Sequence, residues 1–571
     1  MSTPPQNLYE FGPFRLDALR CLLLRGGRHV PLSPKAFETL LVLVLNRGRV
    51  IRKEELIKRI WPDSFVEEGN LTQNIFVLRK ALGEGPNDHR YIVTVPGQGY
   101  RFVAPVREAE TTAGGDGATL ADEAESTERV ASVAVLPFKN LGDENDEDKY
   151  LGLGLADALI TRLSSLSSIA VRSTTAVIRY ADRQQNPREA GHELGVDTVL
   201  AGHFQRAGER IRVTVQLVSL RDSKTLWAEK FDEKFTDVFS VQDSISEQVA
   251  RALTLKLTAE EQRLLTKRYT QNTEAFQAFI RGRYFWNKRT AEGLKKGIEC
   301  AQQAISIDPV YALAYVGLAD SYNLLAGHGG LPPKETFPKA KSAAMRALEI
   351  DNTLAEAYAS LAFVSYRFDW DWTAAEKNFQ RAIELKPNYP TAYHWYGESI
   401  VAMGRFAESI AELHKAHELD PLSIPINTDL GQSYYFAREY ERSEDQLLKT
   451  LEMDSSFVRA RVLCGAVYEQ RGMHDAAIEM LQQAVALSEN NPLTLSGLGH
   501  AYALAGQTAE AGRILEHLLR LSRERYVSAY NIAVVYTGLK QPDAALELLE
   551  QAYDNRDVWL VWLKVNPRFD S

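Results

Sequence analysis

Hydrophobic and polar residues follow two different periods along this chain, and the period changes between regions. Residues 1–107 begin with short strand-like segments up to Val30 and continue with three helix-like segments, SPKAFETLLVLVLNR, RKEELIKRIWP and NLTQNIFVLRKALGE. They end in a strand-turn-strand, YIVTVPGQGYRFV. Residues typical of helix caps, helix stops and tight turns lie at the borders: Ser33, Pro34, Pro62, Gly83, Gly97 and Gly99. Three helices followed by a hairpin predict a winged helix, an α+β fold.

The third helix-like segment, residues 70–82, separates apolar from polar positions. Leu71, Ile75, Leu78 and Leu82 share one helix face, which predicts that this face is buried. The other faces carry donors that can reach base edges or phosphates in a major groove, and Arg101 on the returning strand can reach a minor groove or a phosphate. The residues expected to contact DNA are Thr72, Gln73, Asn74, Val77, Arg79, Lys80 and Arg101.

The next two regions differ in pattern from the first. Residues 108–129 are small, polar and acidic, which predicts a flexible linker. Residues 130–265 open with a buried-strand pattern, VASVAVLPF, followed by a helix over 154–166 and another after Asn186. Three alternating strands follow, TVLAGHFQR, RIRVTVQLVS and TLWAEKFDEKF, and then a helix near 239–265. This order predicts an α/β domain.

Residues 273–556 are helical and repeat every 34 residues, in about eight units. Small and apolar residues recur at matched positions: Gly397, Gly431, Gly465 and Gly499; Ala375, Ser409, Ser443, Ala477 and Ala511; Ile400, Tyr434, Tyr468 and Tyr502. The pattern resembles the tetratricopeptide repeat, in which small residues let paired helices approach closely. Such units stack into an all-α superhelix whose concave surface typically binds peptides or protein segments.

Three features stand apart within this region. Residues 327–337, GHGGLPPKETF, predict a loop in the second unit, and residues 557–571 predict a C-terminal tail. Trp370 and Trp372 either pack between helices or line a ligand groove. Packing is favoured, because aromatic residues at repeat positions usually fill the space between helices.

Charge is distributed unevenly between these regions. The chain of 571 residues has a net charge of −9, yet residues 1–107 hold 16 Lys and Arg against 10 Asp and Glu. The N-terminal region therefore carries +6 and the remainder −15, which indicates an anionic partner for the N-terminal region. The length and a hydrophobic content of 45% predict several folded domains.

The cysteines and the apolar runs bear on the compartment. Cys21, Cys300 and Cys464 lie far apart without a CxxC pair, which argues against a disulfide framework and a thiolate metal site. Residues 1–30 lack the order of a secretory signal. The longest aliphatic run, residues 40–45, is far shorter than the ~20 residues of a membrane span. We expect a soluble, cytoplasmic protein.

Catalytic, metal and cofactor sites are not predicted. Gly152 and Gly154 follow a strand and open a helix, but neither phosphate-loop motif is complete. The acidic run 143–148 lacks the Gly and Glu of a calcium loop, and the His192-Glu193 pair has no second His at metal spacing. We therefore expect that the protein is not an enzyme and holds no cofactor.

Two further resemblances cover most of the chain before residue 265. LSPKAFETLLVLVLNRGRVIRKEELIKRIWP, NLTQNIFVLRKALG and YIVTVPGQGYRF resemble the effector domain of OmpR/PhoB-type regulators, and more closely the N-terminal version in CadC-like regulators. The resemblance implies that residues 70–82 are the recognition helix and residues 91–103 the wing. VAVLPFKNL, YLGLGLADALITRLSSL and LGVDTVLAGHFQRAGERIRVTVQLV resemble the amino-terminal α/β domain of TolB.

The chain departs from these families in two ways, since no receiver domain precedes the winged helix and no membrane span follows it. These observations predict a sequence-specific DNA-binding transcription regulator whose repeats bind a protein, a peptide or a signal. Its expected partners are double-stranded DNA, a peptide on the concave face, RNA polymerase and a second copy of the chain on DNA. The alternative is a scaffold protein whose winged helix serves protein interaction.

Overall fold

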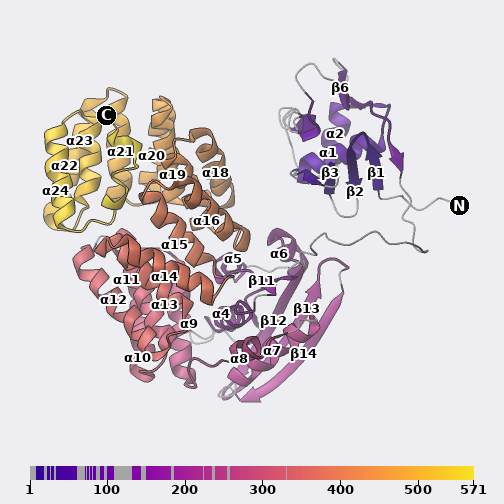
Figure 1. The fold of residues 1–571 in the computed structure, drawn as a ribbon, viewed down its shortest axis with the longest axis horizontal. Helices are drawn as coiled ribbons and strands as arrows, with labels where there is room; N and C mark the ends of the chain where they lie inside the picture. The colour runs from indigo at the N-terminus through magenta and orange to yellow at the C-terminus, as the bar shows by residue number, and fades with distance from the viewer. Residues whose placement is uncertain are drawn as a thin grey trace. The chain divides into compact units, whose positions relative to one another are not determined.

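The computed structural model describes residues 8–108 and 131–570, with gaps inside both ranges. The gaps are 18–21, 26–27, 31, 33, 61–70, 72–73, 76–77, 80, 85–89, 96–98, 143–149, 167, 182–185, 223, 235–237, 254–256, 266 and 329–330. The predicted linker, the acidic run and several predicted cap residues, among them Ser33, Pro62 and Gly97, lie outside the described residues. The chain divides into two compact units, residues 1–126 and 127–571, which are described separately (Figure 1).

Two antiparallel sheets and short helices make up the first unit. The five-stranded sheet has the order β4-β3-β2-β1-β8, with β1 Leu8–Phe11, β2 Phe14–Asp17, β3 Leu22–Arg25, β4 Arg28–Val30 and β8 Arg107–Glu108. The three-stranded sheet has the order β5-β7-β6, with β5 Val50–Arg52, β6 Ile92–Val95 and β7 Gly99–Phe102. The helices α1 Pro34–Leu45 and α2 Lys53–Ile60 lie between these strands in sequence.

The core of the first unit confirms the periodicity of the third helix-like segment. Its described residues are helical up to Leu82, and Leu71, Ile75, Leu78 and Leu82 are all buried. Gly99 has a different role from the expected turn residue, because it pairs with Val95 and Arg52 inside the small sheet. A Cβ there would lie 2.0 Å from the Ile51 carbonyl oxygen, so only glycine fits.

The second unit begins with a mixed sheet. Its order is β11-β9-β12-β13-β14, with β9 Ala131–Val135, β11 Ile169–Val171, β12 Thr198–Ala207, β13 Arg210–Ser219 and β14 Thr225–Lys234; β10 Lys139–Asn140 pairs with β12. The strands β11, β9 and β12 are parallel, and β12 to β14 form an antiparallel meander. Its helices are α4 Leu151–Leu163, α5 Thr174–Val177, α6 Pro187–Glu193, α7 Val238–Ala252 and α8 Ala259–Leu265.

Two expectations for this region need correction. The helix expected near 239–265 is two helices, because Thr258 and Glu261 form a reciprocal cap that starts a new helix at Ala259. The helix expected from residue 154 begins at Leu151, so Gly152 and Gly154 lie inside it. A Cβ on Gly152 would lie 2.0 Å from the Phe138 carbonyl oxygen, and one on Gly154 would lie 2.2 Å from Ile280, so close packing explains both glycines.

Helices α9 to α24 form eight consecutive antiparallel pairs, which we number units 1 to 8 (Figure 1). Their bounds are α9 Thr273–Asn287, α10 Ala291–Ile307, α11 Ala312–His328, α12 Pro333–Ile350, α13 Ala355–Val364, α14 Trp372–Leu385, α15 Pro390–Ala402, α16 Phe406–Leu419, α17 Ile424–Phe436, α18 Tyr440–Met453, α19 Val458–Gln470, α20 His474–Leu487, α21 Pro492–Leu504, α22 Thr508–Glu524, α23 Ala529–Gly538 and α24 Pro542–Asp554. A π-helical turn, Ser365–Asp369, extends α13.

The matched glycines of the repeat have the predicted role. A Cβ on Gly397, Gly431 or Gly465 would lie 2.6–2.7 Å from a leucine of the second helix in the same pair. The two helices of each of these pairs therefore approach closely only because the glycine has no side chain. The matched small residues, Ala375, Ser409, Ser443, Ala477 and Ala511, are likewise buried.

The loop expected over residues 327–337 is shorter than predicted. Helix α11 extends to His328 and α12 begins at Pro333, so most of the segment is helical. Proline at the first helical position is favourable because its φ angle is already helical. Phe337, which the sequence placed in the loop, is buried and stacks on Phe368 at 5.3 Å between ring centroids.

Residues 131–265, which we call the middle region, share one hydrophobic core with the first repeats. This core joins residues of β9, α4, β12 and β13 to residues of α9 and α11, including Val135, Leu155, Phe279 and Tyr311. Cys300 and Cys464 are buried free thiols, and Cys21 lies outside the described residues. Among the helices that the structure describes, none combines the length and apolarity needed to span a membrane.

The first helix of each central pair is buried on most sides, whereas the second is not. In unit 5, eleven of the 13 residues of α17 are buried, against three of the 14 residues of α18. We call the first helix of each pair the inner helix. A helix that lines an open superhelical groove would expose one face, so other parts of the chain must cover the inner helices. The covering parts are the middle region and residues 557–570, which include the short 3-10 turns Leu560–Trp562 and Pro567–Phe569.

Candidate functional site

The predicted DNA-contacting residues are only partly described by the structure. Thr72, Gln73, Val77 and Lys80 lie outside the described residues. Asn74, Arg79 and Arg101 are described, and each is partly exposed. The buried apolar face of the same helical segment points into the domain, which leaves the polar positions on its other sides.

Asn74 and Arg79 have partners inside the domain. The Asn74 amide donates to the Thr39 hydroxyl at 3.3 Å. The Arg79 guanidinium donates to the Ile92 carbonyl at 3.0 Å and to the Thr94 hydroxyl at 2.8 Å, so it joins the helical segment to β6. Both residues therefore support the fold, a role that their spacing in the sequence did not predict.

Arg101 lies on the central strand of the small sheet. Tyr100 and Phe102 on either side of it are buried, so the Arg101 side chain projects from the opposite face, beside Val50 and Val93. Its Nε atom has no hydrogen-bond partner among the residues that the structure describes. The rest of the side chain is partly exposed, and an exposed guanidinium is chemically suited to bind an anionic group.

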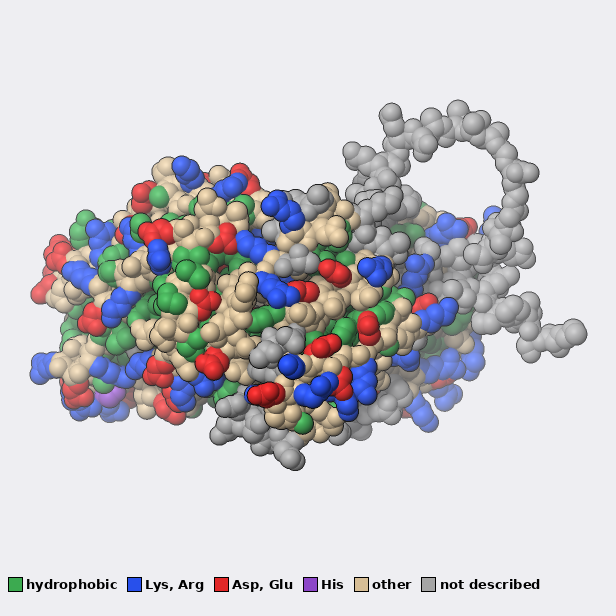
Figure 2. Space-filling model, turned by 90° about the horizontal axis from the view of Figure 1, so that it is seen from below, with side chains coloured by type: hydrophobic (Ala, Val, Ile, Leu, Met, Phe, Trp, Pro, Cys, Tyr) green, Lys and Arg blue, Asp and Glu red, His purple; other side chains and the backbone are tan. Residues whose placement is uncertain are grey.

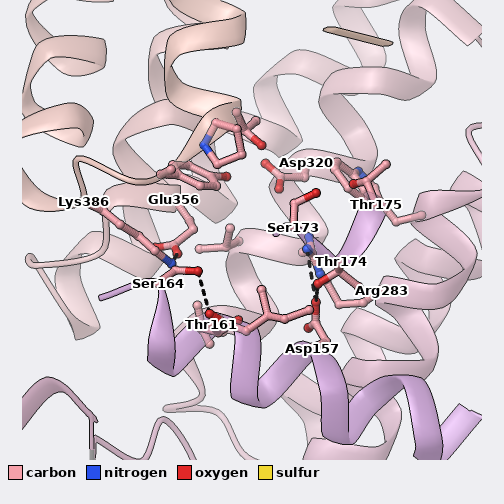
Figure 3. Close-up of a pocket in the computed structure, with 18 of the residues that line it drawn as sticks. Asp157, Thr161, Ser164, Ser173, Thr174, Thr175, Arg283, Asp320, Glu356 and Lys386 are labelled. Atoms are coloured by element: carbon pink, nitrogen blue, oxygen red, sulfur yellow. Dashed lines mark hydrogen bonds and ion pairs between the residues drawn. The ribbon is translucent and has the colours of Figure 1, made fainter. Parts of the chain in front are cut away.

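A cavity lies in the second unit, between the middle region and units 1 to 4 (Figure 3). Asp157, Thr161 and Ser164 reach it from α4, and Arg283 and Asp320 reach it from the inner helices α9 and α11. The charged groups are paired across it: Lys386 donates to Glu356 at 2.8 Å, and the Arg283 guanidinium lies 3.7 Å from Asp157.

Burial shifts the pKa of one residue that lines this cavity and of one residue that lies beside it. It raises the pKa of Asp320 to about 6, because a carboxylate is poorly solvated there even with Arg283 nearby. It also lowers the pKa of Arg289 to about 10. Arg289 lies on the face of Trp286, with its guanidinium carbon 3.7 Å from the ring centroid.

Main-chain carbonyls hold the middle region against the repeats. The buried Arg172 side chain donates to the carbonyls of Leu194 and Gly195 in the middle region, at 2.8 and 2.9 Å. It also donates to Glu418 and Leu419 at the end of α16, at 3.2 and 3.1 Å. The C-terminus of a helix carries partial negative charge, so this position favours a cation.

Comparison with known families identifies both ends of the chain. Residues 27–102 match the family described as "Transcriptional regulatory protein, C terminal". The first unit contains an OmpR/PhoB-type winged-helix domain. Residues 428–492 and 468–530 match tetratricopeptide repeats. Residues 128–248 match "HilA/YgeH-like transcriptional regulator, second domain", and the TolB resemblance of this region stays a prediction from the sequence.

Similar proteins contain one or more of these regions. "Transcriptional regulator HilA" of Salmonella typhi is 24% identical over 419 residues, which is 72% of this chain and 71% of that protein. "Transcriptional activator CadC" of Escherichia coli is 37% identical over 83 residues, 14% of this chain and 16% of that protein. "Putative adenylate cyclase 3" of Rhizobium meliloti is 30% identical over 236 residues, 40% of this chain and 39% of that protein.

Sequence reasoning missed the cavity and the covering of the tetratricopeptide repeats. The cavity residues come from segments up to 234 residues apart, from Asp157 to Thr391, and share no local period. One signal was available: in α17, apolar and polar residues are spread around the whole helix and not separated onto two faces. Trp370 and Trp372 pack against the hydrophobic core of the repeats, as the sequence analysis favoured.

Charged side chains of both signs are interspersed on the face of the molecule that Figure 2 shows. The basic excess of residues 1–107 is therefore a property of that region and not of the chain as a whole. A regional excess of positive charge is what a domain that binds a polyanion requires.

Proposed function

We propose that this protein is a sequence-specific DNA-binding transcription regulator whose tetratricopeptide repeats bind a protein or peptide partner. One observation carries the proposal: Leu71, Ile75, Leu78 and Leu82 are buried, so the apolar face of this helical segment points into the domain and a contact with DNA falls to its polar positions. The match of residues 27–102 to a transcriptional-regulator domain supports this reading, as do the transcriptional regulators among the similar proteins.

The proposed contacts divide into two groups. Thr72, Gln73, Val77 and Lys80 contact base edges and phosphates in the major groove, and Arg101 on the wing binds a phosphate or enters the minor groove. Asn74 and Arg79 also belong to the proposed surface. Because Arg79 holds β6, its replacement would disturb the wing as well as the DNA contact.

The test measures binding of the full chain to its own genomic fragments, selected in one step and then titrated with salt. Lys80→Ala should weaken binding about equally on all fragments and reduce the salt slope by about 1, because one phosphate contact is lost. Arg101→Ala should weaken binding about tenfold or more, as for the loss of a charged hydrogen bond. Gln73→Ala should instead change which fragments are preferred.

Arg15→Ala is the matched control. Arg15 lies on β2 of the other sheet and pairs with Glu10 at 3.3 Å, so its loss removes one positive charge outside the proposed surface. Equal losses for Arg15→Ala and Lys80→Ala would reduce the effect to net charge and contradict the assigned surface. A full chain that binds no genomic duplex at low salt would leave the scaffold alternative.

Further partners and the compartment belong to the same proposal. We place the protein in the cytoplasm with its DNA, as a dimer on paired half-sites, with RNA polymerase as a partner during transcription. Light scattering with and without the selected duplex tests the dimer, and co-purification on that duplex tests RNA polymerase. No catalytic step is proposed; incubation with ATP and Mg²⁺ should therefore yield no cyclic AMP.

A further inference from the structure

Residues 557–570, which we call the inserted segment, lie against the inner helices of the repeats. Its buried residues Val558, Val561, Trp562 and Val565 belong to a hydrophobic core that extends over residues of units 1 to 7. Phe569 packs on Tyr530 of α23 with ring centroids 5.2 Å apart, which fits the position of the chain end beside α23 in Figure 1. The segment thus occupies the surface on which the sequence predicts a bound peptide.

The first half of the inserted segment is held by units 3 and 5. Arg367 of the π-helical turn donates to the Val558 carbonyl at 2.9 Å and lies on the Trp562 ring, 4.2 Å from its centroid. Phe436 of α17 packs on the same ring at 5.8 Å. Trp562 is therefore enclosed between a cation and an aromatic ring, as an anchor residue is in a peptide complex.

The second half is held by units 5 and 6. Arg438 donates to the Val565 carbonyl at 2.6 Å and pairs with Asp570 at 2.7 Å. Arg568 enters a buried position and donates to Glu469 of α19 at 2.8 Å. Side chains of the repeats thus bind both main-chain carbonyls and side chains of the segment, which is how a groove holds an added peptide.

The surface beneath the inserted segment is charged and remains paired without it. Asp429 pairs with His394 at 2.6 Å and with Arg459, and Glu398 pairs with Arg367, all within the repeats. Removal of the segment would cost Glu469 the Arg568 contact but leave it His500 at 3.2 Å. A permanent core is mostly apolar, whereas a surface that at times meets water tolerates charged groups.

We propose that the inserted segment is an internal ligand of the repeats, and that a partner peptide binds by displacing it and copying its chemistry. Such a peptide places a bulky aromatic side chain between Arg367 and Phe436, and a cationic side chain on Glu469. The proposal rests on the proposed function in one respect, the binding of a protein partner by the repeats. It needs no DNA, so its test is independent of the DNA-binding experiments.

The test uses the full chain and a fluorescein-labelled peptide with the sequence of residues 557–570, followed by fluorescence anisotropy. In the opened chain, Trp562→Ala with Arg568→Ala, the segment should leave the groove and the labelled peptide should bind. Binding to the unaltered chain should be at least tenfold weaker, because its own segment competes at high effective concentration. Peptides that carry Trp562→Ala or a scrambled order should bind the opened chain at least tenfold more weakly.

A second measurement covers the case in which the double substitution harms folding. A protease site placed at Asn555–Arg556 lets the unaltered segment fold in place and be cut afterwards. After the cut, the fragment should dissociate on dilution, and the labelled peptide should then bind in the groove. The helical circular dichroism signal and the cooperative thermal melt should be unchanged. Unfolding after the cut, or a fragment that never dissociates, would show that the segment is a permanent part of the fold.

Two further outcomes would overturn the proposal. One is an opened chain that melts cooperatively yet does not bind the labelled peptide. The other is equal binding by the unaltered and opened chains, which would place the peptide site elsewhere. Glu469→Gln in the opened chain adds a specific check, since it should weaken the unaltered peptide but not a peptide that carries Arg568→Ala.

Discussion

Two parts of the chain cover the inner side of the tetratricopeptide repeats, and they do so by different means. The middle region covers the first units through Arg172 and Asn388, whose side chains donate to main-chain carbonyls at 2.8–3.2 Å. The inserted segment covers the later units mainly through packed aromatic and aliphatic side chains, with Trp562 at the centre. The first contact leaves a cavity that charged residues line in part.

The difference indicates which contact is permanent. Carbonyls at the end of a helix need a donor in every folded state, so a side chain that satisfies four of them is part of the fold. A segment held by an aromatic anchor and two charge pairs resembles a bound peptide and can leave without orphaning a buried main-chain group of the inner helices. The following predictions test this distinction, from the largest expected effect to the smallest.

Arg172→Ala should have the largest effect on the second unit. It removes the Arg172 donor from the carbonyls of residues 194, 195, 418 and 419, and the bonds to residues 194 and 419 are buried, so we expect a loss of roughly 3–5 kcal/mol in the free energy of unfolding. Urea denaturation monitored by circular dichroism measures it. Arg381→Ala, on an exposed pair with Glu384, is the control and should change stability by less than about 0.5 kcal/mol.

Trp562→Ala should affect only the later units. Loss of a buried indole costs about 3–5 kcal/mol in a permanent core, but here the loss cannot exceed the free energy that holds the segment in place. We therefore expect faster amide exchange in α17 and α19 and unchanged exchange in α9 and α11. Hydrogen exchange by mass spectrometry measures this. Equal acceleration in all four helices would show that the two coverings form one cooperative unit.

Two buried carboxyl groups, Asp320 and Asp429, should change the stability of the fold in opposite directions as the pH falls. Burial raises the pKa of Asp320 to about 6, above its value in the unfolded chain, so the ionised form destabilises the fold. This cost is present above pH 6 and disappears as the pH falls towards 4. Asp320→Asn removes it, so we expect the variant to be more stable than the unaltered chain by about 2 kcal/mol at pH 7.5 and equal to it near pH 4.

Asp429 of the inner helix α17 provides the contrast. Burial acts to raise its pKa, but Arg459 and His394 lower the pKa to about 2. Its contribution is therefore fully present above the unfolded value near pH 4 and is lost as the pH falls towards 2. Midpoints of urea unfolding measured at pH 7.5, 5.5, 4 and 3 distinguish the effect of Asp320 from that of Asp429. A variant Asp320→Asn with the same pH profile as the unaltered chain would contradict the assignment to Asp320.

Trp370 should give the smallest effect. It has a positive φ of 59° and packs on Tyr553 of α24 at 5.1 Å and under Arg556 at 4.0 Å, so it joins unit 3 to unit 8. Trp370→Ala should cost about 1–2 kcal/mol, through loss of the aromatic and cation contacts. Trp370→Gly should recover about 1 kcal/mol of this, because glycine adopts positive φ without strain. Thermal melts of both variants measure the difference.

Several parts of the fold could be predicted because their signals are local. Leu71 to Leu82 show a helical period, and the period corresponds to a buried face. The strands at 198–207, 210–219 and 225–234 alternate in sequence and pair as a meander. Three of the recurring glycines, Gly397, Gly431 and Gly465, meet a leucine of the paired helix. Each signal depends on residues within one or two neighbouring elements, which chain geometry places together.

The candidate sites could be predicted less well. The sequence assigned Arg79 to a DNA-facing surface, which stays a prediction, and it could not show that the guanidinium also reaches Ile92 and Thr94. The sequence also predicted one helix near 239–265 where the structure has two. The break depends on the reciprocal cap of Thr258 and Glu261, a signal of only two residues. The cavity required the docking of α4 against α9, which no period records.

By itself, the sequence determined the order of the regions, the period of the repeats and the basic character of the N-terminal region. Only the tertiary structure decided what lies on the inner side of the repeats. Arg367 and Val558 meet although 191 residues separate them, and Arg568 reaches Glu469 across 99 residues. Contacts over such separations depend on how the stacked pairs curve, which is set by packing along the whole array and leaves no local pattern.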